Sequence, residues 1–143
     1  QVLHLIKNLK DEIDSSVILI THDLGAVAET CQRVVVMYGG MIMEEGMVEE
    51  IFHNTAHPYT IGLKKSIPQL DRTDGSRLFS IPGSPPSLLN PPKGCPFVSR
   101  CNHAMHICMR EKPPYFALSD THRSMCWLLE KECPNKALKG VTI

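Results

Sequence analysis

Apolar residues in the first part of the chain follow two different patterns. Residues 1–14 carry them at helical spacing, which predicts an amphipathic helix that ends near residue 15; its apolar positions are Val2, Leu3, Leu5, Ile6 and Leu9. The run SVILIT at 16–21 is apolar and β-branched without alternation. Such a run is typical of a strand that is buried on both faces of a parallel sheet.

Further elements follow at short intervals. Residues 23–31, DLGAVAETC, predict a helix that Asp23 caps, and residues 33–46 predict two strands joined at Gly39-Gly40. Residues 47–54 and 57–67 predict two short helices, the second with Pro58 in its first turn. Residues 81–94, IPGSPPSLLNPPKG, hold too much Pro and Gly for a regular helix or strand.

This order of elements predicts the α/β class, with helices packed on a mostly parallel sheet. The strands are few, because the buried strand at 17–21 needs a neighbour on each side. One interpretation is a small α+β domain. The interpretation that we favour makes residues 1–54 the end of a larger domain.

The content of Pro and Cys rises sharply near residues 54–70, which indicates a boundary between two units there. Of the 11 Pro and 6 Cys, all but Pro58 and Cys31 lie after residue 67. The net charge is zero and the basic residues form no run, so charge gives no indication of a nucleic-acid partner. Apolar runs fall far short of the roughly 18 residues that span a bilayer, and no secretion signal opens the chain.

The stretch at 17–46, VILITHDLGAVAETCQRVVVMYGGMIMEEG, resembles the C-terminal part of an ABC-transporter ATPase domain, a P-loop NTPase. HPYT at 57–60, the Pro-rich segment and the spaced cysteines resemble the C-terminal extension of the oligopeptide/dipeptide-importing branch. The resemblance therefore implies two units: residues 1–54 as the end of the nucleotide-binding domain, and 55–143 as an irregular Cys- and Pro-rich accessory domain.

The resemblance also implies a function. It makes His22 the switch histidine that contacts the γ-phosphate, whereas a lone histidine would otherwise be read as a cap or a core residue. The parent protein would use ATP and Mg²⁺, pair with a second ATPase subunit as a homo- or heterodimer, and drive transmembrane permease subunits at the cytoplasmic face of the membrane. A peptide-binding protein would take part indirectly, and nickel and sugar importers have related ATPases.

Other parts of an ATPase are missing from the sequence. It has no G-x-x-x-x-G-K-[ST] loop to hold phosphates, no magnesium-binding aspartate with its adjacent catalytic glutamate, and no Ser-Gly-Gly signature. We therefore expect ATP hydrolysis from the full-length parent and none from residues 1–143 alone.

Four cysteines are the second candidate site: Cys95, Cys101, Cys108 and Cys126. Disulfides would suit a small secreted protein. Zinc sites normally show short C-x2–4-C pairs, which are lacking here, although His103 and His106 offer further ligands. Unliganded thiols are a third alternative. Wider spacing suits a [4Fe–4S] cluster, and some members of the importing branch that this chain resembles bind one. A cluster held by the four cysteines is our leading interpretation.

Two further expectations concern the surroundings of these thiols. Cys31 and Cys133 are assigned no role, and the cluster would be shielded by Phe97, Met105, Tyr115 and Trp127. His57 would brace the junction of the two units. The competing hypothesis for the whole chain is a stand-alone iron–sulfur or zinc module with a redox or interaction role, in which His22 would be structural.

Overall fold

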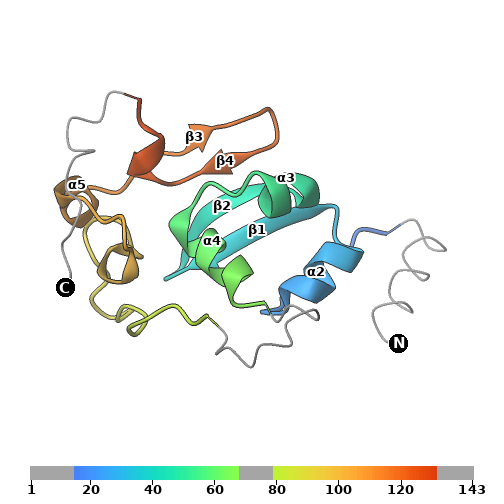
Figure 1. Ribbon diagram of the computed structural model, residues 1–143, viewed down its shortest axis with the longest axis horizontal. Coiled ribbons are helices and arrows are strands. Elements are labelled where there is room, and N and C mark those ends of the chain that lie inside the picture. The colour runs from blue at the N-terminus through green and yellow to red at the C-terminus, as the bar shows by residue number, and fades with distance from the viewer. Residues whose placement is uncertain (1–14, 68–78, 132–143) are drawn as a thin grey trace.

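A computed structural model describes residues 15–67 and 79–131 of the chain (Figure 1). Its centre is a four-stranded sheet in the order β1-β2-β4-β3, with every neighbouring pair antiparallel. The strands are β1 (Arg33–Tyr38), β2 (Met41–Met47), β3 (Phe116–Ala117) and β4 (Arg123–Ser124). The described part is thus mixed α and β, but the expected parallel arrangement is wrong.

The β1–β2 hairpin follows from its sequence. Gly39 and Gly40 have φ of 57° and 77°, a left-handed pair that glycine adopts without steric cost and that matches the twist of the two strands. Burial alternates along β1: Val34 and Val36 face the core. Val35 and Met37, on the other face of this edge strand, are 46% and 58% exposed.

Three helices follow the predicted positions: α2 (Leu24–Thr30), α3 (Val48–His53) and α4 (Pro58–Lys65). Asp23 caps α2, accepting hydrogen bonds from the Gly25 and Ala26 backbone nitrogens at 2.8 and 3.2 Å. Helices α3 and α4 lie against the β1–β2 hairpin (Figure 1). One core joins α2, β1 and α3 through the side chains of Val27, Val34, Val36 and Ile51.

The strand predicted at 17–21 is not formed. Residues 15–21 run as irregular chain, and Ile18 and Ile20 are 90% and 95% exposed. A strand of this kind is stable only between two neighbours that bond its backbone and cover its faces, and the described residues offer none beside it. The helix predicted at 1–14 lies outside the described residues.

The later part of the chain is mostly irregular, as its Pro content predicts. After residues 79–94 it forms short 3₁₀ turns at Val98–Arg100 and Trp127–Leu129 and one helix, α5 (His106–Arg110). Strand β4 then pairs with β2, so the sheet draws strands from both predicted units. The domain division at residue 54 stays a prediction. Among the described residues, no helix has the length and apolar character to cross a membrane.

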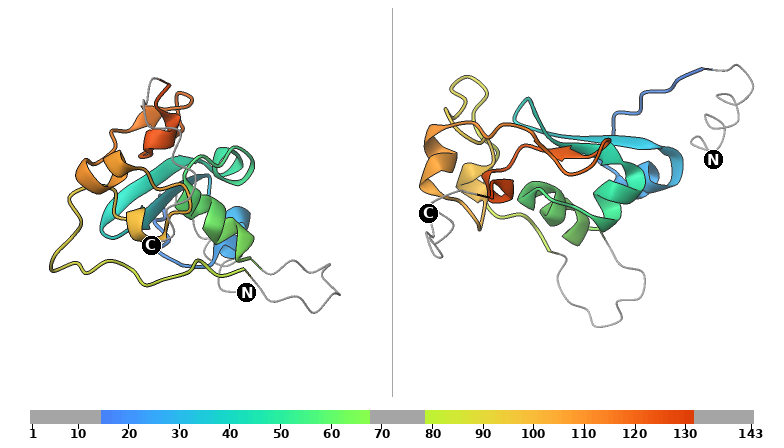
Figure 2. Two further views of the ribbon diagram at one scale, coloured as in Figure 1. Left: turned by 60° about the vertical axis from the view of Figure 1, so that its left-hand side comes forward. Right: turned by 90° about the horizontal axis from the view of Figure 1, so that it is seen from above.

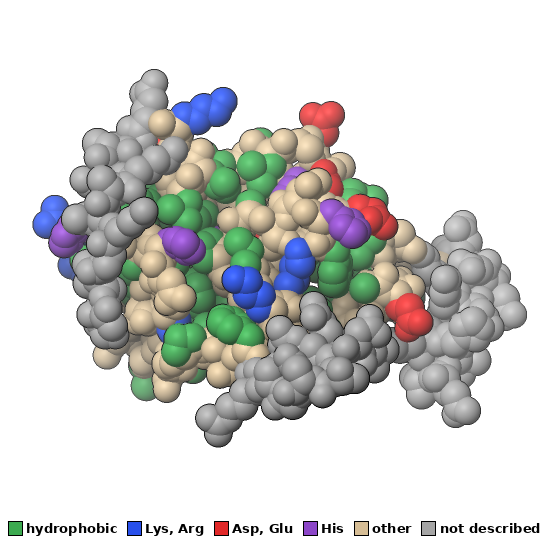
Figure 3. All heavy atoms as spheres, in the orientation of Figure 1, with side chains coloured by type: hydrophobic (Ala, Val, Ile, Leu, Met, Phe, Trp, Pro, Cys, Tyr) green, Lys and Arg blue, Asp and Glu red, His purple; other side chains and the backbone are tan. Residues whose placement is uncertain are grey.

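Two views place this segment relative to the helices. Helix α5 and the surrounding loops occupy one end of the molecule, and α2 occupies the other (Figures 1 and 2). Charged side chains on the face drawn in Figure 3 are scattered and gather in no large patch of one sign, in line with the zero net charge.

Arg100 fastens the Pro-rich segment to the hairpin. Its guanidinium donates to the carbonyls of Pro82 and Ile81, each at 2.8 Å, and to the Tyr38 hydroxyl at 3.2 Å. The guanidinium carbon also lies 5.8 Å from the centre of the Tyr38 ring. A planar side chain with five donors is suited to such a three-way contact.

We predict that Arg100→Ala lowers the free energy of unfolding by roughly 1–3 kcal/mol, because it removes several charge-assisted hydrogen bonds. It should also raise the rate of proteolysis within residues 79–94. Arg110→Ala, an exposed position at the end of α5, is the matched control. Equal proteolysis rates for the two variants would contradict this role of Arg100.

Candidate functional site

Four thiols meet in one cavity, which we call the thiol cavity. It is lined by Cys95, Cys101, Cys108 and Cys126 together with His57, Pro58, Phe97, Val98, His103, Pro113, Trp127 and Leu128. All four cysteines named from the sequence are therefore brought together, although 31 positions of chain separate the first from the last. The five cysteines among the described residues are free thiols, so the disulfide alternative has no support there.

Backbone N–H groups point at three of these sulfurs. Those of Phe97 and Val98 face Cys95, that of His103 faces Cys101, and that of Leu128 faces Cys126. Each of these contacts favours a thiolate and lowers the pKa of its cysteine.

Burial acts in the opposite direction and is stronger. It raises the pKa of the Cys95 and Cys126 thiols to about 12, and it raises that of Cys101 as well. The three thiols therefore keep their protons at neutral pH unless a cation compensates the charge. A metal that bound here would displace protons.

Gly94 permits the approach of two cysteine-bearing segments. A Cβ on Gly94 would lie 2.1 Å from the Cys108 carbonyl oxygen, a distance at which backbone atoms clash. Without it, the Cys95 nitrogen donates to that same oxygen at 2.8 Å. Glycine at position 94 therefore sets the Cys95 and Cys108 backbones side by side.

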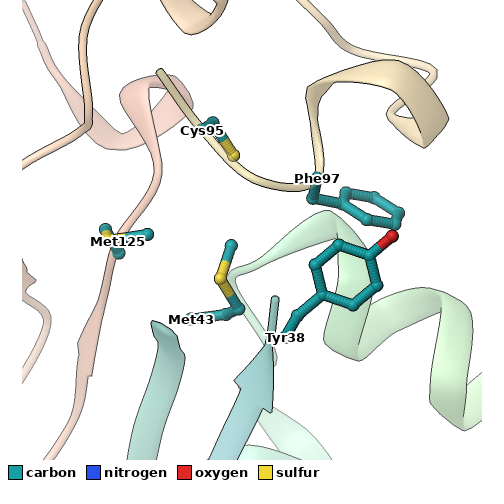
Figure 4. Packing of buried hydrophobic residues seen from close by; sticks show 5 residues of the cluster. All are labelled: Tyr38, Met43, Cys95, Phe97 and Met125. Carbon is teal, nitrogen blue, oxygen red and sulfur yellow. The ribbon is translucent and has the colours of Figure 1, made fainter. Parts of the chain in front are cut away.

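An apolar core supports the cavity from below. Figure 4 shows Cys95 above the side chains of Met43 and Met125, with the Phe97 ring against Tyr38. The Tyr38 and Phe97 rings meet edge to face at 5.3 Å between centroids. This core connects β2, the Cys95 loop and the chain after β4, and so holds the first and last cysteines in place.

Glu44 is a buried carboxylate on β2, where the connection between α3 and α4 meets the segment that precedes β4. It accepts hydrogen bonds from the Ala56 and His57 backbone nitrogens at 2.7 and 3.0 Å, and its Oε1 lies 2.8 Å from His122 Nε2. Neither side chain of the Glu44–His122 pair is more than 3% exposed. Sequence reasoning missed both residues, because nothing local shows that residues 78 positions apart will pair.

His57 is fixed by this carboxylate and by its own helix. As the N-cap of α4 it accepts the Tyr59 N–H on Nδ1 at 3.0 Å, and its side chain reaches the thiol cavity. It is 1% exposed, and burial lowers the pKa of its imidazole to about 4. The expectation that His57 braces the junction is consistent with these contacts.

Some of the residues expected beside the four thiols line the cavity, and others do not. Phe97 and Trp127 line the thiol cavity, whereas Tyr115 is 41% exposed and donates to the Ile42 carbonyl. Of the two histidines offered as zinc ligands, His103 lines the cavity and His106 does not. Met105 is buried but is not among the lining residues. Cys31 packs in the core formed by α2, β1 and α3, and Cys133 lies outside the described residues.

The metal itself is not confirmed. Among residues 15–67 and 79–131, no group of three or more His, Cys, Asp or Glu side chains has an arrangement that holds a metal ion. The four thiols therefore share a cavity without forming a single-ion site such as tetrahedral zinc requires.

His22 lies at the other end of the molecule. It is exposed and directly precedes the Asp23 cap of α2, and the Asp23 nitrogen donates to Thr21 Oγ1 at 3.0 Å. Helix α2 and the cysteine-bearing loops are at opposite ends in Figures 1 and 2. The two candidate sites are therefore separate, and the sheet lies between them.

We predict that Glu44→Ala lowers the free energy of unfolding by about 3–5 kcal/mol, because it leaves the buried His57 N–H, the partly buried Ala56 N–H and the buried His122 side chain without their partner. Glu49→Ala is the control, since that side chain is 80% exposed and forms only a surface pair with His53. Urea titration of both variants measures the difference. A Glu44→Ala protein as stable as the control would contradict a central role for Glu44.

We predict that the chain loses stability in acid partly through His57. Between pH 6.5 and about 4 the unfolded imidazole binds a proton that the folded one excludes, so stability falls as pH falls. The slope from this one group reaches about 1.4 kcal/mol per pH unit. Denaturant unfolding at several pH values should show a shallower fall for His57→Asn, whose amide still caps α4. The same fall in both proteins would contradict the assignment.

Comparison with known proteins gives a consistent answer. Residues 43–108 match the family described as the oligopeptide/dipeptide transporter, C-terminal region. Over 134 residues the chain is 50% identical to the oligopeptide transport ATP-binding protein OppD of Bacillus subtilis, covering 94% of this chain and 37% of that protein. The dipeptide transport ATP-binding protein DppD of Lactococcus lactis is 51% identical over 134 residues, with 94% and 38% covered. The Salmonella typhimurium OppD protein is 46% identical over 127 residues, with 89% and 37% covered.

The chain thus spans 37–38% of the length of these relatives. The family match runs from β2 to α5 and includes Glu44, His57 and three of the four cavity cysteines. Such relatives give no support to the alternative of a stand-alone iron–sulfur or zinc module. The chain belongs to the family of oligopeptide/dipeptide ABC-transporter ATP-binding proteins, and it carries their C-terminal region.

Proposed function

We propose that the protein to which these residues belong is the ATP-hydrolysing subunit of an ABC importer for dipeptides or oligopeptides. The observation that carries this proposal is the similarity over 94% of the chain to proteins named for oligopeptide and dipeptide transport. Hydrolysis is assigned to the whole subunit with its ATP and Mg²⁺, because residues 1–143 lack a phosphate-binding loop.

His22 is the residue of this chain that would take part in hydrolysis. Its side chain is exposed just before a capped helix, so its imidazole is free to reach a bound nucleotide. An imidazole N–H can donate to a γ-phosphate oxygen and so respond to the presence of that phosphate. Asp23 is occupied as a cap and takes no part.

The partners and location follow from the same proposal. Two ATP-binding subunits, identical or related, close around ATP and drive permease subunits, while a peptide-binding protein acts indirectly. The subunit then lies at the cytoplasmic face of the membrane as a peripheral protein, and no nucleic acid is involved. Residues 1–54 complete the nucleotide-binding domain, and 55–143 form its accessory domain.

We predict that His22→Ala in the full-length subunit reduces ATP hydrolysis by roughly 100-fold or more while ATP still binds, as expected when a donor to developing charge is removed. His53→Ala is the control, because this exposed histidine pairs only with Glu49 on the surface. Phosphate release measures the role of His22 in hydrolysis, and uptake of labelled di- and oligopeptides measures whether the importer carries peptides. Near-normal hydrolysis by His22→Ala would contradict the role of His22, and hydrolysis without peptide uptake would contradict the substrate.

The thiol cavity is proposed to hold a [4Fe–4S] cluster through Cys95, Cys101, Cys108 and Cys126. Two observations support it: the four thiols share one cavity, and backbone N–H groups face three of the sulfurs. In a cluster each thiolate binds a different iron, so the sulfurs stand farther apart than around a single ion. The absence of a single-ion arrangement among the described residues therefore counts against zinc more than against a cluster.

The proposed role of the cluster is structural or regulatory. When bound, it supplies iron–thiolate bonds that tie the ends of the irregular loops together. The segment needs such a connection, because residues 79–131 contain only short elements and much Pro. Pro113 stiffens one wall of the cavity, and the Trp127 indole donates to the Glu111 carbonyl at 3.1 Å to hold another.

We predict that the full-length protein, purified without oxygen, contains about four irons and four acid-labile sulfides per chain with visible absorption from iron–thiolate bonds. Cys101→Ser should lose most of the iron, whereas Cys31→Ser should retain it, because Cys31 packs in a different core. One zinc without sulfide, or no metal with all four thiols reactive, would contradict the cluster.

A further inference from the structure

A turn in the backbone surrounds His22, the residue of this chain that is proposed to contact nucleotide. The chain bends at His22, and a hydrogen bond from the Asp23 backbone nitrogen to Thr21 Oγ1, 3.0 Å long, closes the bend. A threonine hydroxyl that accepts an N–H two residues later forms a tight turn without help from the rest of the fold. The Thr21 side chain therefore limits the directions that the backbone at His22 can take.

The other side of the turn is fixed by helix α2, which the chain enters through this turn (Figure 1). Asp23 Oδ1 accepts the Gly25 and Ala26 N–H groups at 2.8 and 3.2 Å. The Asp23 carbonyl accepts the Val27 N–H at 3.2 Å, and the Val27 side chain lies in the core that α2 shares with β1 and α3. Position 23 is therefore tied to the packed part of the molecule, and the turn carries this restraint back to the residue before it.

The His22 imidazole has no such support of its own. It is exposed, and within residues 15–67 and 79–131 it has no hydrogen-bond or ion-pair partner. The direction in which the ring points thus depends on the backbone that carries it. A donor that must meet a phosphate oxygen acts best when its position is set before the ligand arrives, because ordering it on binding costs free energy.

We propose that Thr21 is a positioning residue for His22. Its hydroxyl accepts the Asp23 N–H and so holds the backbone at His22 in the bent form, with the exposed imidazole next to the start of α2. Thr21 itself touches no nucleotide and transfers no proton. The inference rests on the proposed role of His22 in ATP hydrolysis, and it adds the residue on which the placement of that imidazole depends.

The hydroxyl of Thr21, and not its bulk, is the feature that matters here. Thr21 is exposed, so a change of its side chain leaves no cavity in a core. Loss of one exposed hydrogen bond between neighbouring residues also changes the free energy of unfolding little. Stability and hydrolysis should therefore separate: a variant without the hydroxyl stays folded, and its chemical step slows.

The test uses three variants of the full-length subunit. Thr21→Val replaces the hydroxyl by a methyl group of similar size, and Thr21→Ser keeps a hydroxyl at the same position. Thr30→Val is the matched control, because the Thr30 hydroxyl donates to the Ala26 carbonyl at 2.6 Å, at the end of α2 away from His22. Circular dichroism and unfolding curves establish that all three variants are folded.

The first readout separates kcat from KM for ATP. We expect Thr21→Val to lower kcat roughly tenfold, less than loss of the imidazole itself, because a misplaced donor keeps part of its effect. KM should stay within about twofold of the wild type, since the variant removes no contact to bound ATP. Thr21→Ser and Thr30→Val should both match the wild type.

The second readout requires no nucleotide. In protein labelled with ¹⁵N at histidine, relaxation of the His22 amide reports how freely its backbone moves on the ps–ns timescale, and the signal is assigned by its loss in His22→Ala. The order parameter of this amide should fall in Thr21→Val, from about 0.85 toward 0.6 or below. It should not change in Thr21→Ser or Thr30→Val.

A double variant separates this inference from the proposed function. Because Thr21 acts through His22, Thr21→Val in a His22→Ala background should slow hydrolysis no further than His22→Ala alone. A second, independent decrease, an unchanged kcat in Thr21→Val or an unchanged order parameter would each overturn the positioning role, while slow hydrolysis by His22→Ala would still support the proposed function. Near-normal hydrolysis by His22→Ala would overturn the role of His22 and the positioning role with it.

Discussion

The Glu44 carboxylate is the contact on which the arrangement of this chain depends most. It lies on β2, the central strand that receives β4, and it binds backbone of the α3–α4 connection and the side chain of His122 just before β4. A fully buried carboxylate is costly unless it is hydrogen-bonded, and here two backbone N–H groups donate to it while His122 Nε2 lies 2.8 Å from its Oε1. The same group therefore fixes the start of α4 and brings back a segment from far along the sequence.

The thiol cavity forms because Glu44 holds β2, the start of α4 and the segment before β4 together. Cys95 follows the Pro-rich segment that Arg100 fastens to the hairpin, and Cys126 follows β4 by two residues. Once β4 is paired with β2, Met125 packs on Met43 and the last cysteine is brought toward the first. Short 3₁₀ turns and a five-residue helix then suffice to place Cys101 and Cys108.

The elements that sequence reasoning predicted well are those with local causes. The Asp23 cap, the Gly39-Gly40 turn and Pro58 in the first turn of α4 each act within a few residues. The strand expected at 17–21 failed for a physical reason: its apolar composition requires neighbours that the described chain does not provide. The four cysteines singled out by the resemblance and by their spacing line one cavity, and their role as ligands stays a prediction. Glu44, His122 and Arg100 act through contacts between residues 12 to 78 positions apart, which no local sequence pattern reveals.

The central proposal is that the four cysteines of the thiol cavity hold an iron–sulfur cluster, at the end of the molecule opposite α2 and the adjacent His22. Anomalous diffraction at the iron absorption edge from crystals of the full-length, anaerobically prepared protein tests it most directly. The account predicts one strong iron peak enclosed by Cys95, Cys101, Cys108 and Cys126. Well-ordered cysteines with no iron peak between them, or cysteines joined in disulfides, would contradict it.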